Sequence, residues 1–450
     1  MRRILLTLAR TMCAISIISV CVLCLGTRSC AAPGQSIALE GRLNCPYVPY
    51  RGGMAYLQVS VTTPGEQPAL RRPMNLAIVL DRSGSMAEDG KIENAKRALY
   101  SLIDQLTSED LVSIVSYDDV INVLCETQRA VNKAHLKSLV EGIFPRGSTN
   151  LGGGMVEGFR QVGRNASKEF VNRVILLSDG LANQGITDSH ELDRIAQQYR
   201  SRSISLSTMG VGLDYNENLM AGLSEAGGGN YYFIECPNEL AFIVRKELSA
   251  LSSIIAQNAC IELSTGANVC VMDAIGCESH SEGSHLIIPV GDLYVKDRRE
   301  FTVELQVPEG TGEFIVASGV LRYDDRRLTN SYPSFRAMVR YSKDVAEIEK
   351  HRDWDTEGKA EVAVSTRRVE NAMKALDEGN QDEAARELET ATMFLSASPA
   401  ASQAGTGAAA IHAQMEKMDS YRPLLKDSTS DTRRAKKSIQ YDNLQTLRKK

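Results

Sequence analysis

Histidine is scarce in this sequence, and the motifs of common hydrolases are missing. Only six of the 450 residues are histidines, and no two of them have the spacing that places a pair of zinc ligands on one helix face. The sequence also lacks a G-x-S-x-G motif, which carries the nucleophilic serine of many hydrolases. We therefore expect neither a zinc peptidase nor a serine hydrolase, and we predict that the chain is not an enzyme.

A strong charge of either sign is also missing. The chain has 51 lysines and arginines against 56 aspartates and glutamates, which gives a formal net charge of −5 at pH 7. Proteins whose main partner is a nucleic acid usually have a basic domain, so we expect no nucleic-acid partner. A length of 450 residues exceeds what one core usually holds, and we expect two or three domains.

Long hydrophobic runs are confined to the N-terminus. Arg2 and Arg3 precede an apolar run from Ala14 to Leu25, and Cys30-Ala31-Ala32 offers small residues for a cleavage site. This pattern predicts a signal peptide over residues 1–32 and export to the periplasm, the cell envelope or the cell exterior. The run is shorter than the ~20 residues of a membrane span, and we expect no transmembrane segment in the mature chain. An uncleaved membrane anchor and a lipid anchor on a nearby cysteine are the alternatives.

Six cysteines remain after the predicted signal peptide. An even number of cysteines in an exported protein favours disulfide bonds. We expect a disulfide within one group of four, whose connectivity the sequence leaves open, and buried thiols at the other two positions. The four are Cys45, Cys260, Cys270 and Cys277, and the other two are Cys125 and Cys236.

From residue 73 to residue 252, apolar runs alternate with amphipathic segments. Asn75–Leu80 is a nearly continuous apolar run, which is typical of a parallel strand covered on both faces. Ile92–Leu106 has the apolar spacing of a helix. Val120–Cys125 follows the strand expected at Leu111–Tyr117 closely enough to form a hairpin. Alternating strands and helices predict an α/β domain with a doubly wound, mostly parallel sheet and one antiparallel edge strand.

The flanks of this domain have the short alternating runs of a β-sandwich. One such run, Ala55–Thr62, lies before the domain, and the expected strands after it lie within 256–341. The strand before the domain needs partners, so we predict that the α/β domain is inserted into a sandwich formed by residues 33–72 and 256–341. This insertion would bring Cys45 towards Cys260–Cys277.

The C-terminal part of the chain is charged and predicted to be helical over residues 343–420. The pattern indicates a helical hairpin with its turn at residues 377–381, and an Ala/Gly/Ser linker at residues 399–409. Residues 421–450 form a basic tail that we expect to be disordered, with contact to an anionic surface as one role.

Three motifs carry hydroxyl and carboxylate oxygens at the ends of expected strands or the starts of expected helices. They are Asp81-Arg82-Ser83-Gly84-Ser85-Met86, Gly147-Ser148-Thr149-Asn150 and Leu177-Ser178-Asp179-Gly180. Such hard oxygen ligands suit Mg²⁺, and open α/β sheets bind ligands beyond the carboxyl ends of their strands. A phosphotransfer reaction at Asp81 would require a second aspartate two residues later, where Ser83 stands.

Together these motifs resemble the von Willebrand factor A domain and its metal ion-dependent adhesion site. The resemblance covers roughly residues 73–252, and the flanks are similar to bacterial homologues of Ca-activated chloride channel proteins and inter-alpha-trypsin inhibitor heavy chains. It implies one Mg²⁺, with Mn²⁺ or Ca²⁺ as alternatives. It also implies that two serines bind the metal directly through their hydroxyls and that a threonine binds it directly or through water. Two aspartates would act largely through water. These residues are Ser83, Ser85, Thr149, Asp81 and Asp179.

The same resemblance implies a binding function. Neutral hydroxyl ligands leave charge on the cation, which in the family accepts a glutamate or aspartate carboxylate of a partner protein. We therefore predict an exported, metal-dependent adhesion or assembly module that binds an acidic residue of another protein. The alternative is an envelope scaffold that acts through its helical C-terminal region, with a purely structural metal site.

Overall fold

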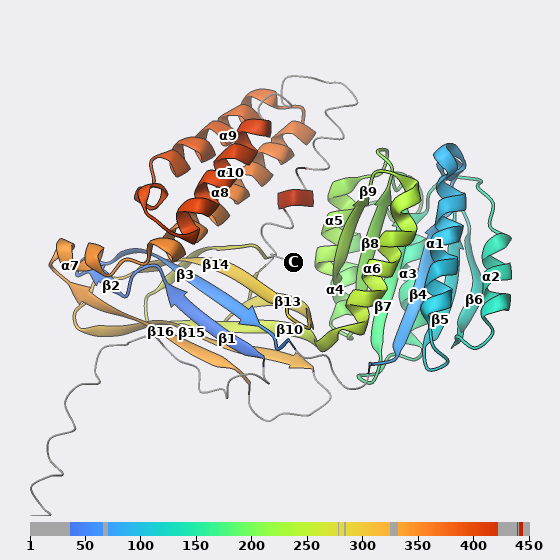
Figure 1. Ribbon diagram of the computed structural model, residues 1–450, viewed down its shortest axis with the longest axis horizontal. Helices are drawn as coiled ribbons and strands as arrows, with labels where there is room; N and C mark the ends of the chain where they lie inside the picture. The colour runs from blue at the N-terminus through green and yellow to red at the C-terminus, as the bar shows by residue number, and fades with distance from the viewer. Residues whose placement is uncertain are drawn as a thin grey trace, which may run out of the picture.

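The computed structural model describes residues 37–65, 71–277, 279–282, 285–324, 332–421, 439 and 441–443. In Figure 1 these residues form an α/β domain, a β-sandwich beside it, and a helical bundle packed on the sandwich. The predicted signal peptide and most of the basic tail lie outside the described residues. Among the helices of the described ranges, none combines the length and the apolar character of a membrane span.

The sheet of the α/β domain has six strands in the order β6-β5-β4-β7-β8-β9. The strands are β4 (Met74–Asp81), β5 (Leu111–Tyr117), β6 (Ile121–Arg129), β7 (Val171–Ser178), β8 (Ser205–Val211) and β9 (Gly228–Ile234). All neighbours pair in parallel except β6, which is antiparallel to β5 at the edge. The strand order reverses between β4 and β7, which are the first and fourth strands of the sheet along the chain. The predicted doubly wound, mostly parallel sheet is confirmed.

Helices cover both faces of this sheet. On one face lie α1 (Lys91–Gln105), α2 (Lys133–Glu141) and α6 (Leu240–Ser252), and on the other lie α3 (Leu151–Gly163), α4 (Ser189–Arg200) and α5 (Glu217–Ala226). Every residue of β4 is buried, with Ile78 in one core and Val79 in the other. Because alternate side chains enter two cores, the strand needs the nearly continuous apolar run of its sequence.

The β-sandwich contains strands from both sides of the α/β domain. Its sheets have the orders β1-β3-β14-β11 and β12-β13-β10-β15-β16-β2. The strands are β1 (Ala38–Leu43), β2 (Tyr47–Pro49), β3 (Gly53–Thr62), β10 (Ile254–Thr265), β11 (Cys270–Ile275), β12 (His280–Glu282), β13 (His285–Tyr294), β14 (Arg298–Val307), β15 (Glu313–Asp324) and β16 (Ser334–Ser342). β3 pairs with β14 along its whole length, so the α/β domain is inserted into the sandwich, as predicted.

The C-terminal helices form a three-helix bundle after the short helix α7 (Val345–Lys350). They are α8 (Trp354–Asp377), α9 (Gln381–Ser396) and α10 (Thr406–Tyr421). The linker predicted at residues 399–409 is wrong in its second half, because α10 begins at Thr406. A Cβ atom at Gly358 would lie 2.9 Å from the Cα of Gly407, so the small residues there allow two helices to approach closely.

The basic tail differs from its predicted disorder where it is described. Residues 439 and 441–443 are helical, and Ile439 is buried in the core of the bundle. The ring of Tyr441 packs against the ring of Tyr231 in β9, with 6.2 Å between the ring centroids. In Figure 1 this short red helix lies between the bundle and the α/β domain. The tail therefore returns to contact both units.

The six described cysteines are all free thiols, so the disulfide prediction is not confirmed. Cys45 is buried against α7, where its Sγ atom donates to the carbonyl of Ile348. Cys125 is buried in β6, as predicted, but Cys236 is exposed. The prediction for Cys236 was wrong because β9 ends at Ile234, before it reaches the cysteine.

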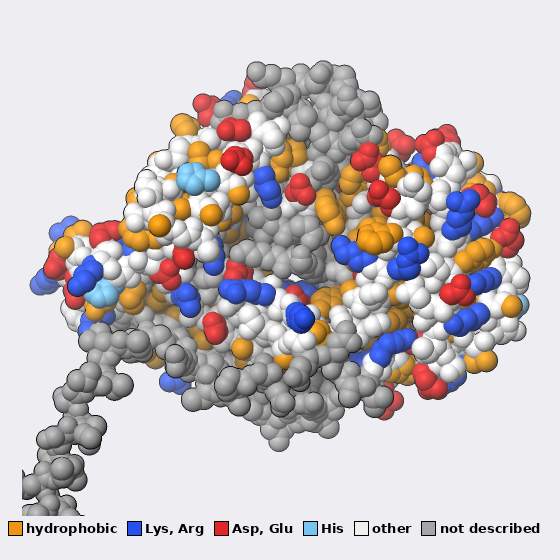
Figure 2. Space-filling view, in the orientation of Figure 1, with side chains coloured by type: hydrophobic (Ala, Val, Ile, Leu, Met, Phe, Trp, Pro, Cys, Tyr) orange, Lys and Arg blue, Asp and Glu red, His pale blue; other side chains and the backbone are white. Residues whose placement is uncertain are grey.

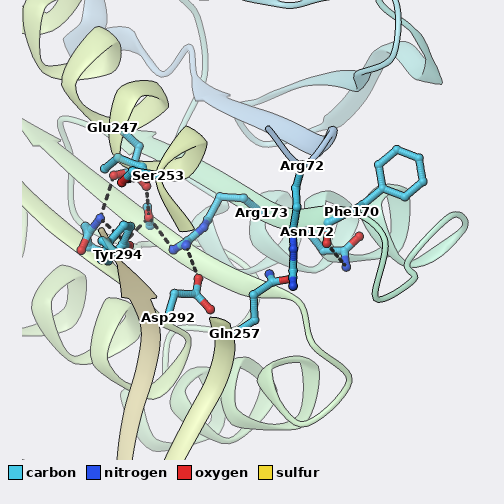
Figure 3. A network of polar contacts seen from close by, with 12 residues as sticks. Arg72, Phe170, Asn172, Arg173, Glu247, Ser253, Gln257, Asp292 and Tyr294 are labelled. Atoms are coloured by element: carbon cyan, nitrogen blue, oxygen red, sulfur yellow. Dashed lines mark hydrogen bonds and ion pairs between the residues drawn. The ribbon is translucent and has the colours of Figure 1, made fainter. Parts of the chain in front are cut away.

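A buried polar network joins the α/β domain to the sandwich (Figure 3). The fully buried guanidinium of Arg173 in β7 contacts the carboxylate of Asp292 in β13 at 2.5 Å. The same guanidinium donates to Ser207, whose hydroxyl donates in turn to Glu247 of α6 at 2.6 Å. Asn230 also donates to Glu247. Strands β7, β8, β9 and helix α6 are thereby tied to one strand of the sandwich.

We expect Asp292→Ala to destabilise the protein by about 3–5 kcal/mol, because it leaves the Arg173 guanidinium buried without its carboxylate. The free energy of unfolding in urea measures this loss. The matched control is Lys168→Ala, which breaks a solvent-exposed ion pair to Asp324 at the same joint and should change stability by less than about 1 kcal/mol. Equal effects of the two changes would contradict the assigned role of the buried pair.

Candidate metal centre

The five predicted site residues meet at the carboxyl ends of β4 and β7, where the strand order reverses. Asp81 is the last residue of β4, and Asp179 follows the last residue of β7. Thr149 comes from the loop before α3. Ser83 and Ser85 come from the loop and short 3₁₀ turn after β4. Four of the five are buried and Ser85 is half-buried. They lie beyond the carboxyl ends of the strands, at the position of the ligand-binding crevice of open α/β sheets, and we call this place the crevice.

Asp81 holds the loop that carries the two serines. Its Oδ1 atom accepts the backbone N–H of Ser83 at 2.8 Å. Its Oδ2 atom accepts the hydroxyls of Ser178 at 2.7 Å and of Tyr117 at 3.4 Å. Burial raises the pKa of Asp81 to about 6, although the hydrogen bonds from Ser83 and Ser178 oppose the rise. Because both oxygens accept protein donors, Asp81 acts first as the anchor of the loop.

Four oxygen-bearing side chains gather beside this anchor, and we call them the oxygen cluster: Ser83, Ser85, Thr149 and Asp179. The hydroxyl oxygens of Ser83 and Ser85 are 3.1 Å apart, and the hydroxyl of Ser85 lies 2.8 Å from Oδ1 of Asp179. A Cβ atom at Gly180 would lie 3.2 Å from Oγ1 of Thr149 and 3.7 Å from Oγ of Ser85. A larger side chain at Gly180 would therefore fill the space that these oxygens face.

The oxygen cluster has the chemistry and spacing that a small divalent cation requires. In an octahedron with metal–oxygen distances of about 2.0–2.1 Å, neighbouring ligand oxygens are roughly 2.9 Å apart. The two oxygen–oxygen distances of 2.8 and 3.1 Å fit this spacing. Within the described residues, no group of three or more His, Cys, Asp and Glu side chains is placed to hold a metal. The spacing of the oxygens in the cluster fits Mg²⁺ held mainly by hydroxyls.

Backbone contacts fix the loop of Thr149 against its neighbours. The N–H of Thr149 donates to the side chain of Asn183 at 2.9 Å, and the N–H of Asn183 donates back to the carbonyl of Thr149. The N–H of Gly84 donates to the carbonyl of Gly147 at 3.1 Å. Gly147 has a φ of 70°, and a Cβ atom there would lie 2.0 Å from the carboxylate of Asp119. Only glycine fits this turn.

Two arginines and one aspartate form the rim of the crevice. The buried carboxylate of Asp118 accepts from Arg82 at 2.9 Å and from Arg146 at 2.7 Å. Burial alone would raise the pKa of Asp118, but the hydrogen bonds from Arg146 and Val120 and the two positive charges hold it below its usual value. The hydrogen bond and the charge of Asp118 raise the pKa of Arg146, and the nearby carboxylate of Asp119 adds to the rise, so two carboxylates accompany the two arginines. On the face shown in Figure 2, basic side chains of the α/β domain are mixed with acidic ones.

The sequence reasoning missed Lys91, the first residue of α1. Its ammonium contacts Oδ2 of Asp179 at 2.8 Å, and the two side chains are 3% and 0% exposed. A cation is unfavourable at the start of a helix, where the macrodipole is positive. A lysine at this position is therefore a sequence signal for a nearby carboxylate. Lys91 lies just outside the apolar pattern of Ile92–Leu106 that predicts the helix.

Comparisons with known proteins agree with this fold. The family model for the von Willebrand factor type A domain matches residues 75–246. The uncharacterized protein YfbK of Escherichia coli (strain K12) is 29% identical over 185 residues, which are 41% of this chain and 32% of that protein. The uncharacterized protein sll0103 of Synechocystis sp. is 26% identical over 282 residues, 60% of this chain and 66% of that protein. The chain thus covers about one third of the length of YfbK and just under two thirds of the length of sll0103.

Solved structures extend the likeness beyond the α/β domain. A von Willebrand factor type A protein from Catenulispora acidiphila aligns with a TM-score of 0.69 at 16% identity, over 92% of this chain and 98% of that one. The ArnB paralog VWA2 from Sulfolobus acidocaldarius aligns with a TM-score of 0.60 at 17% identity, with the same coverage. The fold and the three motifs agree with the family model, so residues 75–246 form a von Willebrand factor type A domain.

Proposed function

We propose that this chain is an exported protein-interaction module that binds a divalent cation and, through it, an acidic side chain of a partner protein. The observation that carries the proposal is the oxygen cluster, whose hydroxyl and carboxylate oxygens are 2.8 and 3.1 Å apart at the strand-order reversal. Export rests on the signal-like sequence of residues 1–32. The role is binding rather than catalysis.

Ser83, Ser85 and Thr149 would hold the cation, with Asp179 beside them and Asp81 behind the loop. When bound, Mg²⁺ supplies a concentrated positive charge that accepts a further oxygen ligand. Asp81 keeps the two serines in place through the Ser83 N–H. Because the serine and threonine ligands are neutral, they leave much of the cation's charge for a carboxylate from outside.

The rim supports the choice of an acidic partner. Arg146 has a side chain that is 61% exposed and shares the carboxylate of Asp118 with Arg82. The exposed guanidinium of Arg146 is placed to attract an approaching carboxylate. An aspartate or glutamate on the surface of a second protein fits both the crevice and its rim.

We expect Mg²⁺ to raise the melting temperature of the wild-type protein, and Thr149→Ala and Ser85→Ala to abolish that rise. A ligand at one hundred times its dissociation constant stabilises a folded protein by about 2.7 kcal/mol. Thermal unfolding with Mg²⁺ and with EDTA measures the shift. These variants test the site more cleanly than Asp179→Ala, which would leave the Lys91 ammonium buried without its partner.

Ser113→Ala is the matched control for this series. Ser113 is a buried serine of β5 whose hydroxyl donates to the carbonyl of Leu76, in the same sheet. This variant should keep the full Mg²⁺ shift even if its baseline stability falls. Loss of the shift in Ser113→Ala, or its survival in Thr149→Ala, would place the cation elsewhere.

We expect immobilised wild-type protein to capture a partner from an envelope extract in Mg²⁺ and to release it in EDTA. Thr149→Ala should capture none in either condition, and Ser113→Ala should match the wild type. Converting the carboxylates of the extract to amides should abolish capture, because the cation would then find no anionic oxygen. Capture that persists in EDTA would favour a scaffold role, with the metal site structural.

A further inference from the structure

We propose that Lys91 makes the metal centre selective for an anionic ligand while it weakens the binding of the cation itself. This inference rests on the proposed function, since it concerns the residue that sets the charge of that same site. It assigns to Lys91 a positioning and charge-setting role, with no direct contact to the metal.

The two oxygens of Asp179 face in different directions. Oδ1 accepts the hydroxyl of Ser85 at 2.8 Å, within the oxygen cluster. Oδ2 accepts the ammonium of Lys91 at 2.8 Å, outside it. A cation held by the cluster would therefore share one carboxylate with Lys91, and the ammonium need not leave when the cation binds.

The backbone after β8 packs against the side chain of Lys91. Gly212, which follows β8, has a φ of 79°, and a Cβ atom there would lie 3.3 Å from Cε of Lys91. Lys91 is only 3% exposed, so water does little to screen its charge from the neighbouring crevice. The ammonium is thus held close to the oxygen cluster rather than left free in solvent.

Counting charges shows what this placement does. The carboxylates of Asp81 and Asp179 balance a divalent cation, and the three hydroxyls are neutral. Lys91 therefore leaves the loaded centre with one positive charge, which a partner carboxylate neutralises. Without Lys91 the loaded centre would be neutral, and a carboxylate would gain less from binding it than from binding the positive centre of the wild type. The same ammonium repels the entering cation and competes for Asp179.

A purely structural role for Lys91 makes different predictions. If Lys91 only orients Asp179 through its hydrogen bond, then its removal should weaken cation binding or leave it unchanged. The charge-setting role instead predicts opposite changes for the cation and for the anion. Measuring both on the full chain separates the two roles.

The test is isothermal titration of the wild type and Lys91→Met with Mn²⁺, alone and with acetate as a carboxylate probe. We expect Lys91→Met to bind Mn²⁺ roughly tenfold more tightly, because a nearby positive charge is removed. Acetate should strengthen Mn²⁺ binding by the wild type and have little effect on Lys91→Met. Unchanged or weaker Mn²⁺ binding by the variant, or an undiminished acetate effect, would overturn the inference.

Two further variants keep the test decisive. Lys96→Met is the control: Lys96 lies on the same helix, is equally buried at 3%, and pairs with Glu93 instead of the site, so it should behave as the wild type. Lys91→Gln removes the charge but keeps a donor for Asp179, and it replaces Lys91→Met if that variant does not fold. A wild type that binds no Mn²⁺ at millimolar concentration would refute the proposed function itself. If instead the wild type binds Mn²⁺ and Lys91→Met binds it equally well, only the role of Lys91 is refuted.

Discussion

The parallel pairing of β4 with β7 is the constraint on which the site depends. The two strands pair in register from Met74 with Val171 to Leu80 with Leu177. Asp81 follows Leu80 directly, and Asp179 follows Leu177 after one further residue, at the same edge of the sheet. Because side chains alternate between the faces of a strand, a slip of one residue would turn each of them to the opposite face. The apolar side chains of the two cores on either side of β4 and β7 prevent this slip.

Strand β7 contributes to the joint with the sandwich near its start and to the crevice at its end. Its third residue, Arg173, contacts Asp292 of the sandwich, and its last residue, Ser178, donates to Asp81 in the crevice. All eight residues of the strand are buried. The joint with the sandwich and the oxygen cluster therefore share one rigid element. Both also contain buried charges. Arg173 and Asp179 each have an opposite charge at hydrogen-bond distance, whereas Asp81 and Glu247 are satisfied by neutral donors.

The sheet, its helices and the two aspartates at its edge could be predicted because they depend on patterns that are short along the chain. The resemblance to the von Willebrand factor A domain added Ser83, Ser85 and Thr149. The apolar runs of β4 and β7 mark strands covered on both faces, and the polar residues that follow must then lie at one edge of the sheet. The alternating apolar pattern of β3, typical of a strand with one buried face, likewise indicated that β3 pairs with strands beyond the inserted domain. In each case a local pattern of burial limited the possible arrangement to a few.

The order of hydrophobic and oxygen-bearing residues by itself determined the domain insertion and the position of the two aspartates at the edge of the sheet. Only the tertiary structure decided the partner of Lys91, the exposure of Cys236 and the return of Tyr441 to Tyr231. These features join segments that are far apart along the chain, or depend on where a strand stops. The sequence pattern around a single charged or aromatic side chain does not indicate which distant residue it contacts. That contact is known only once the fold has brought the two segments together.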